Sequence, residues 1–244
     1  MIVNRAHCFF EQSGTFKRAF QQLNIDALDY DIQNDYNQTD IVCDLFNEIE
    51  TAYLGMPTIF DDIKKDDLIL AFFPCIYFCE SNMMFFCGTN LNYKRMNFSQ
   101  LDILEDVIKR DNRRHDYYVL LLKLFYVCEK FQLRLIVENP YNAHHYLRFN
   151  FPYQPAVIDM NRRLKGDFVK KPTQFFFLNC TPAGKVSMQF DKPQEFTRNR
   201  HSSKTSGVCS SDRSKISDDY ARNFICDHIL GIDSGHTQPL LFNF

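Results

Sequence analysis

Two short apolar runs in the hydrophobic pattern of the chain end on polar or reactive residues. The run Leu68–Phe73 leads directly into Pro74–Cys75, and the run Leu133–Val137 leads into Glu138–Pro140. Runs of this length, rich in Leu, Ile, Val and Phe, predict buried β-strands. In an open α/β sheet, functional groups gather just beyond the carboxyl ends of the strands. We therefore expect a thiol and a carboxylate to meet at one edge of a central sheet.

The amino-terminal segment has the layout of a nucleotide-binding βαβ unit. A predicted strand at Ala6–Phe10 is followed by a turn with one glycine, Gly14, and the apolar residues of Phe16–Leu23 then follow a helical spacing. A second predicted strand, Ile25–Leu28, ends on Asp29. The glycine lets the backbone approach a ligand, and the acid can accept hydrogen bonds from ribose hydroxyls. An ordinary βαβ crossover without a ligand has the same spacing, so both interpretations stay open.

The remaining pattern predicts further strands and a long irregular segment. Strands are expected at Asp40–Leu45, where Asp44 lies near the end, and at Gln174–Leu178. The segment Ser81–Phe98 is rich in Met, Phe and Asn without a clean period, which predicts a loop. Strands that alternate with helical segments predict an α/β fold with a mostly parallel central sheet and helices on both faces.

Three segments carry helix signals. Leu101–Lys109 and Tyr117–Lys130 have helical apolar spacing, and the second is apolar almost all round, which predicts a helix buried against the sheet. The charged residues between them, 109–115, predict a solvated connection, with phosphate contact as the alternative. Ser217–Leu230 begins with an N-cap serine and two acids, and Gly231 follows its end.

The character of the sequence changes after residue 140. Prolines interrupt the segment 141–177, and basic residues alternate there with aromatic ones. Lysine and arginine suit phosphates and aromatic rings suit bases, so we expect nucleic acid to be contacted here, through Arg162, Arg163, Lys170 and Lys171. The predicted organisation is an α/β core at 1–140, a small basic and aromatic region with a flexible loop at 141–216, a returning helix at 217–231 and a tail at 232–244.

Composition and charge narrow the class of protein. The chain has 244 residues and is 45% hydrophobic, which is enough for one large domain with its own core. Because the net charge is -2, nucleic-acid binding would need a local basic patch. The nine cysteines are an odd number without a Cys-x-x-Cys pair, which argues against a secreted disulfide scaffold and a zinc ribbon. We expect a cytoplasmic protein of a bacterial or phage-infected cell, without a membrane span or a metal, and we interpret His144 and His145 as a surface pair.

The order of these motifs resembles that of the DNA cytosine 5-methyltransferase family, in particular its small phage-type members. The segment Phe10–Phe16 is similar to the Phe-x-Gly-x-Gly cofactor turn, and Asp219–Phe224 looks like the carboxyl-terminal helix that closes the cofactor pocket. The acids at 29 and 44 fall where the family binds the ribose and borders the adenine. The resemblance implies a Rossmann-like methyltransferase fold and an S-adenosylmethionine cofactor. It implies cofactor contacts from Phe10, Gln12, Ser13, Gly14, Thr15, Asp29, Asp44 and Asn223.

The resemblance also implies a catalytic pair. Pro74-Cys75 is similar to the Pro-Cys pair that supplies the nucleophile, and Glu138-Asn139 is similar to the Glu-Asn pair whose carboxylate holds the target ring. A thiolate that adds to the 6-carbon of cytosine makes an enamine, which can attack a methyl sulfonium. The target base must leave the duplex to reach such a pocket. The implied roles are nucleophile for Cys75, acid for Glu138 and turn-shaping residue for Asn139.

Departures from the family pattern keep two other hypotheses open. Gln12 stands at the first glycine of the cofactor turn and Phe73 at a usual proline, which favours a methyltransferase-like protein that binds nucleic acid without catalysis. Alternatively, Asn139–Tyr141 is a degenerate Asn-Pro-Pro-Tyr motif of an amino-methyltransferase, which needs no cysteine. The Gln-x-Arg-x-Arg motif of the main family is absent, and the chain is short for a recognition domain, so a protein partner could supply specificity. Arg162, Arg163 and Lys171 are the candidates to replace the missing motif, and Lys171–Thr173 is similar to a basic strand-entry motif of phage-type members.

Overall fold

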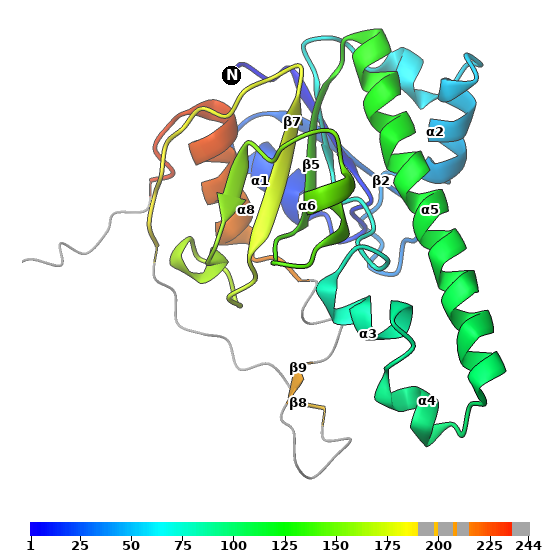
Figure 1. Ribbon diagram of the computed structural model, residues 1–244. Helices are drawn as coiled ribbons and strands as arrows, with labels where there is room; N and C mark the ends of the chain where they lie inside the picture. Colours follow the sequence, from blue (N-terminus) through cyan, green and yellow to red (C-terminus); the bar gives the residue numbers. More distant parts are fainter. Residues whose placement is uncertain (190–197, 200–206, 209–214, 236–244) are drawn as a thin grey trace, which may run out of the picture.

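The computed structural model describes residues 1–189, 198–199, 207–208 and 215–235, and its centre is a seven-stranded mixed sheet (Figure 1). The first five strands in sheet order pair in parallel, whereas the sixth is antiparallel to both of its neighbours. A second, two-stranded sheet pairs β8 (Arg198–Asn199) with β9 (Gly207–Val208). The order across the large sheet is β3 (Ile41–Val42), β2 (Asp26–Asp31), β1 (Arg5–Phe9), β4 (Leu68–Ala71), β5 (Arg134–Pro140), β7 (Thr173–Leu178) and β6 (Val157–Asp159).

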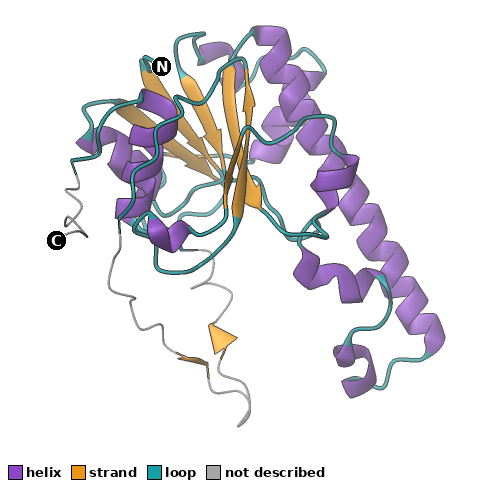
Figure 2. Cartoon of the chain, turned by 60° about the vertical axis from the view of Figure 1, so that its left-hand side comes forward, coloured by secondary structure: helices purple, strands orange, loops and turns teal. Residues whose placement is uncertain are grey.

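Helices cover both faces of the sheet, as predicted, and the molecule is an α/β protein (Figure 2). One face is covered by α1 (Thr15–Gln22) and α8 (Asp218–Phe224), which pack against each other. The other face is covered by α2 (Leu45–Tyr53) and α5 (Gln100–Phe131). A strand enclosed on both sides must be apolar throughout, which explains the uninterrupted run of β4.

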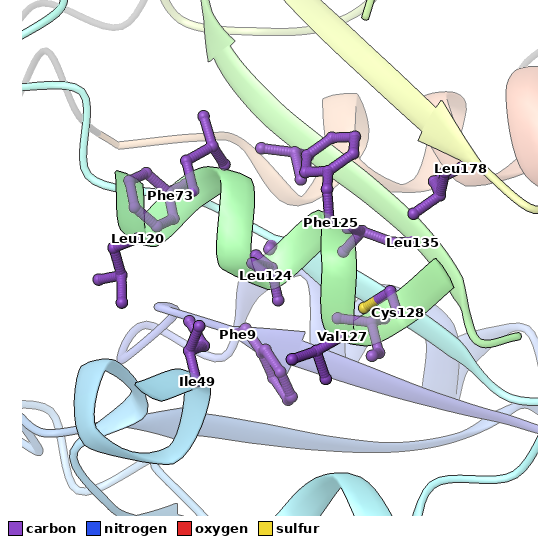
Figure 3. Close-up of a cluster of buried hydrophobic side chains, with 14 of the residues drawn as sticks. Phe9, Ile49, Phe73, Leu120, Leu124, Phe125, Val127, Cys128, Leu135 and Leu178 are labelled. Atoms are coloured by element: carbon purple, nitrogen blue, oxygen red, sulfur yellow. The ribbon is translucent and has the colours of Figure 1, made fainter. Parts of the chain in front are cut away.

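The two faces of β4 belong to two separate hydrophobic clusters. Leu68 and Leu70 pack with α1 and α8, whereas Ile69 and Ala71 pack with α2 and α5. Figure 3 shows the second cluster, where side chains of α5 lie among those of the sheet and of α2. Burial of this apolar surface is the main favourable contribution to folding.

The predicted break in the long helix is wrong. Residues 109–115 continue the helix, and α5 is a single element of 32 residues. The charged segment contains neither proline nor glycine, and its charges stabilise helix: Glu105 pairs with Lys109 at 2.6 Å and Asp106 with Arg110 at 2.7 Å. The charged residues 109–115 thus indicated a solvent-exposed segment correctly, but they do not form a connection between two helices.

The loop predicted at Ser81–Phe98 is also wrong, because this segment forms short helices. They are a 3-10 turn at Glu80–Asn82, α3 (Met83–Phe86) and α4 (Leu91–Arg95). The Tyr93 hydroxyl donates to the Asp106 carboxylate at 2.5 Å, so this segment packs against α5. Together with the amino-terminal half of α5, it forms an arm that extends away from the sheet (Figure 1).

The predicted carboxyl-terminal helix is confirmed. Ser217 Oγ accepts a hydrogen bond from the Tyr220 backbone N–H at 3.0 Å, as an N-cap does, and Gly231 ends the helix with a φ of 70°. Its last part, Ile225–Leu230, has a π-helical hydrogen-bond pattern. The predicted strand at Asp40–Leu45 is reduced to the two residues of β3, because Asp44 caps α2.

Residue 140 does not separate two structural units. The region 141–216 contributes β6, β7 and the short helix α6 (Tyr146–Asn150), and both strands complete the main sheet. The flexible loop predicted within this region, over the basic residues 191–215, lies almost entirely outside the described residues. The expected surface pair of histidines is wrong for His145, which is fully buried, so that burial lowers its pKa to about 4. Among the described helices, none combines the length with the apolar character that crossing a bilayer requires.

Two leucines of α5 test whether the cluster of Figure 3 is the core. Leu124 is fully buried, whereas Leu101 is 78% exposed on the arm. We expect Leu124→Ala to lower the free energy of unfolding by about 2–5 kcal/mol, because it leaves a cavity. Leu101→Ala, the control in the same helix, should change it by less than about 0.5 kcal/mol. Urea unfolding followed by circular dichroism measures both, and equal effects would contradict this assignment.

Candidate active site

A cavity of about 710 Å³ lies at the carboxyl edge of the sheet. Its walls come from residues at the carboxyl ends of four adjacent parallel strands, β2, β1, β4 and β5. Between β1 and β4, the order in which the chain adds strands to the sheet reverses its direction. Ligands of open α/β sheets bind at this switch point. The lining includes Phe10–Ser13 and Thr15 after β1, Asp31–Gln33 at β2, Phe72–Cys75 after β4, and Glu138 of β5.

The turn after β1 is held by a residue that the pattern did not single out. Glu11 is buried, and its Oε1 accepts a hydrogen bond from the Phe16 backbone N–H at 2.8 Å and from the Ser13 hydroxyl at 3.3 Å. It therefore caps α1, whose N-cap residue Gly14 has no side chain to do so. Burial raises the pKa of the Glu11 carboxyl to about 7. The sequence did contain a signal for this role: a helix that begins after a glycine has no capping side chain at its N-cap, so another polar residue nearby is expected to cap it.

Gly14 acts through its backbone and not as part of the cavity wall. Its φ of 66° lies in the left-handed region, and an added Cβ would lie 3.2 Å from Arg18 Nη1 and 3.4 Å from Asp29 Oδ2. Glycine is the residue that accepts this conformation without strain. Of the predicted turn contacts, Phe10, Gln12, Ser13 and Thr15 line the cavity.

The prediction that Asp29 faces a ribose is wrong. Asp29 is fully buried inside β2, and Lys17 Nζ donates to its Oδ1 at 3.0 Å. The same oxygen accepts the backbone N–H of Asp40 at 2.7 Å, so this carboxylate joins α1 to the loop before β3. Asp31 lines the cavity instead. The strand β2 extends to Asp31, beyond the predicted end at Leu28. Residues two apart on a strand point to the same face, so Asp31, and not Asp29, is the acid on this face at the strand end.

Asn223 is not part of the cavity either. It is fully buried in α8, and its Nδ2 donates to the Lys165 carbonyl oxygen at 3.0 Å and to Gln189 Oε1 at 2.7 Å. Lys215 and Ile216, just before the helix, are the residues of this segment that line the cavity. Asp44 lines the cavity and also caps α2, accepting the Phe46 backbone N–H at 3.0 Å.

Cys75 and Glu138 line the same cavity, although 62 residues separate them in the chain (138 minus 75, less one). Cys75 is partly exposed, and Glu138 is 8% exposed. Glu138 Oε1 is buried and has no hydrogen-bond partner among the described residues. An unpaired carboxylate oxygen at a cavity wall is able to receive a donor from a ligand.

Three neighbours set the acidity of the Cys75 thiol. A hydrogen bond with the Cys79 thiol lowers the pKa of Cys75 below that of an ordinary thiol, and the Lys171 ammonium lowers it further. Burial and the Glu138 carboxylate act in the opposite direction. Thiolate is the nucleophilic form of cysteine, so the arrangement favours reactivity at Cys75.

Asn139 lies behind the cavity and holds its two chemical groups in place. It is fully buried, and its Nδ2 donates to the Phe73 carbonyl oxygen at 3.1 Å and to the Glu138 carbonyl oxygen at 2.6 Å. The first bond joins the end of β5 to the turn that carries Pro74 and Cys75. Asn139 thereby fixes the position of the thiol relative to the carboxylate.

The four predicted nucleic-acid contacts have different environments. Lys171 lines the cavity, and Arg163 and Lys170 are exposed. Arg162 is fully buried, where its Nε donates to Asp167 Oδ2 at 2.5 Å and its guanidinium lies over the Tyr220 ring. The prediction that Arg162 contacts nucleic acid is therefore wrong, because an arginine enclosed in a buried ion pair cannot reach a phosphate. Within the described residues, no group of three or more His, Cys, Asp or Glu side chains could hold a metal ion.

The acidity of Cys75 provides a test of this geometry. The pKa of Cys75 is measured from the pH dependence of its alkylation by iodoacetamide, read by peptide mass spectrometry. We expect a value below that of an ordinary thiol. Lys171→Ala should raise it, because a cation that stabilises the thiolate is lost, and Glu138→Gln should lower it, because a repelling charge is lost. Lys170→Ala is the control, and an equal shift in that variant would contradict the placement.

The bond from Asn139 to Phe73 provides a second test. Asn139→Ala leaves a buried carbonyl oxygen without its donor, which should lower the free energy of unfolding by about 1–3 kcal/mol. We also expect faster alkylation of Cys75 at a pH where the thiol is fully ionised, because the turn becomes mobile. Asn179→Ala, which removes a partly buried amide at the other edge of the sheet, is the control for stability alone. Unchanged alkylation in Asn139→Ala would show that the bond does not fix the turn.

The comparisons with known proteins add no family. A scan against protein-family models finds no match for the chain, and a search of curated proteins finds no similar sequence. The functional assignment therefore depends on the cavity and on the residues that line it.

Proposed function

We propose that the protein is an S-adenosylmethionine-dependent DNA methyltransferase, which transfers a methyl group to the 5-carbon of cytosine through a Cys75 adduct. The observation that carries this proposal is the convergence of Cys75, Glu138 and the turn after β1 on one cavity. In this proposal the sheet is of the Rossmann-like methyltransferase type. Its 3-2-1-4-5 order is that of doubly wound nucleotide-binding sheets, with β7 inserted next to β5.

The charges around the turn favour a cofactor without phosphates. Glu11, Asp31 and Asp44 all line the cavity. The Glu11 carboxyl accepts the hydrogen bond of the Phe16 backbone N–H at the start of α1. A phosphate bound at this helix start would need the same N–H as a donor. A dinucleotide cofactor is thereby disfavoured. S-adenosylmethionine has no phosphate, carries a sulfonium and an ammonium, and supplies an electrophilic methyl group.

The substitution of Gln12 for a family glycine is compatible with such a cofactor. Its side-chain Nε2 donates to Gln33 Oε1 at 2.9 Å, and its Oε1 accepts the Asp35 backbone N–H at 3.2 Å. These bonds hold the amide against the loop after β2, so the side chain forms part of the wall. Phe73, the second departure, is packed between Phe10 and Phe78 and supports the turn before the thiol.

The other half of the cavity is suited to a flipped cytosine. The Cys75 thiolate adds to the 6-carbon, and Glu138 donates a proton to, or shares one with, the ring nitrogen at position 3, which stabilises the adduct. Lys171 lines the same cavity, and its positive charge lowers the pKa of the Cys75 thiol. The amino-methyltransferase alternative requires Asn139 to face the substrate, whereas its amide is used by backbone oxygens behind the cavity.

The proposal is tested by incubating the purified chain with methyl-labelled S-adenosylmethionine and mixed-sequence DNA, duplex and single-stranded. Nucleoside analysis should find the label in 5-methylcytosine. Cys75→Ala should abolish the product, and Glu138→Gln should slow it by roughly 10²–10⁴-fold, as loss of a proton-transfer group does. Cys180→Ser, at the far end of β7, is the control and should retain the activity.

Two other outcomes would replace the proposal. Label in an exocyclic amine that persists in Cys75→Ala would select the amino-methyltransferase. Absence of label in every substrate, together with measurable DNA binding and no cofactor binding by calorimetry, would select the non-catalytic binding protein.

A further inference from the structure

A second thiol lies on the same turn as Cys75. The Cys79 backbone N–H donates to the Cys75 carbonyl oxygen at 3.1 Å, and the Phe78 backbone N–H donates to the same oxygen at 2.9 Å. Residues four apart in such a helical turn have their side chains on the same side. The two thiols share a hydrogen bond, which lowers the pKa of Cys75 and raises that of Cys79. One turn thus holds a sulfur nucleophile next to a protonated thiol.

The turn has the freedom and the access that a disulfide needs. Side chains four apart on a helical turn have Cβ atoms about 5–6 Å apart, and a disulfide requires about 4 Å. Residues 76–79, beyond the part of the turn that Asn139 holds, lie outside regular helices and strands, so a small backbone movement there can bring Cys79 to Cys75. Cys75 lines the cavity and Cys79 is partly exposed, which lets a small oxidant reach them.

We propose that Cys75 and Cys79 form a reversible intramolecular disulfide, and that this modification withdraws the nucleophile from the cavity. Formation of the bond is independent of the proposed function, whereas the resulting loss of methyl transfer rests on it. Low-pKa, accessible cysteines next to a resolving thiol are the typical sites of reversible oxidation. Cys79 would also protect Cys75 from irreversible oxidation to the sulfinic acid.

Hydrogen peroxide is the oxidant class that balances the reaction. The Cys75 thiolate attacks one peroxide oxygen, the O–O bond breaks, and hydroxide leaves, so that Cys75 becomes a sulfenic acid. The Cys79 sulfur then attacks the Cys75 sulfur, the S–O bond breaks, and the oxygen leaves as water with the proton of Cys79. In total, two thiols lose two electrons and two protons, and one peroxide becomes two waters.

The test uses the full chain treated with hydrogen peroxide, after which free thiols are blocked with N-ethylmaleimide. Chymotrypsin cleaves after Tyr77 and Phe78, between the two cysteines, so a disulfide appears as a linked pair of peptides in the mass spectrum. We expect the Cys75–Cys79 link, loss of methyl transfer, and recovery of both thiols and activity with dithiothreitol. Cys180→Ser, whose partly buried thiol lies near Leu135 at the other edge of the sheet, should behave as the native chain does.

Variants at Cys79 separate the outcomes. In Cys79→Ser and Cys79→Ala, checked for folding by circular dichroism, peroxide should oxidise Cys75 beyond the sulfenic acid, and dithiothreitol should no longer restore it. The inference is overturned if the native chain gives oxidised Cys75 without the link, or links Cys75 to another cysteine such as Cys87. It is also overturned if the linked protein still transfers methyl groups. A native chain that is inactive before oxidation refutes the proposed function, while the linked peptides still decide whether the thiols pair.

Discussion

One hydrogen bond, from the Asn139 side-chain amide to the Phe73 carbonyl oxygen, joins the two strand ends that form the candidate site. The ladder between β4 and β5 ends where Ala71 pairs with Val137. Two residues further, at Phe73 and Asn139, the two segments diverge, because β5 continues to pair with β7 whereas the segment after β4 turns away from the sheet. The amide thus replaces a ladder bond that the backbone can no longer make. Since Cys75 and Glu138 are close neighbours of these two residues in the chain, their relative position depends on it.

Aromatic packing supports the same turn from the other side. The Phe73 ring lies 5.4 Å from Phe10, 6.2 Å from Phe46 and 6.5 Å from Tyr117, so it contacts the turn after β1, helix α2 and helix α5. A proline at this position could not make these contacts. The walls of the cavity are therefore set by buried side chains of several elements, which hold the site more rigidly than a surface loop would.

The sequence allowed six of the seven strands of the large sheet, the helices on both faces and the meeting of Cys75 with Glu138 to be predicted, because apolar runs that end in polar residues mark strand ends. It did not predict the short edge strand β6 (Val157–Asp159). It did not locate the acid of β2. The predicted strand ended at Leu28, whereas β2 runs to Asp31, and because side chains alternate along a strand, Asp29 and Asp31 point to the same face at different depths. Arg162 was mistaken for a surface residue because its partner Asp167 closes an ion pair that only the tertiary fold creates. No local rule of sequence distinguishes a buried arginine from an exposed one.

The charge distribution of the cavity follows from what each acid already does for the fold. Glu11 caps α1 and Asp44 caps α2, so both carboxyls are placed by the amides at the starts of helices. With its pKa raised to about 7, Glu11 is partly protonated near neutral pH, but its Oε1 can accept the Phe16 amide in either state. A phosphate would have to displace this carboxyl, whereas a cationic ligand would meet no such competition. In the proposed function, helix capping and cofactor selection are therefore performed by the same side chain, and neither can be changed without the other.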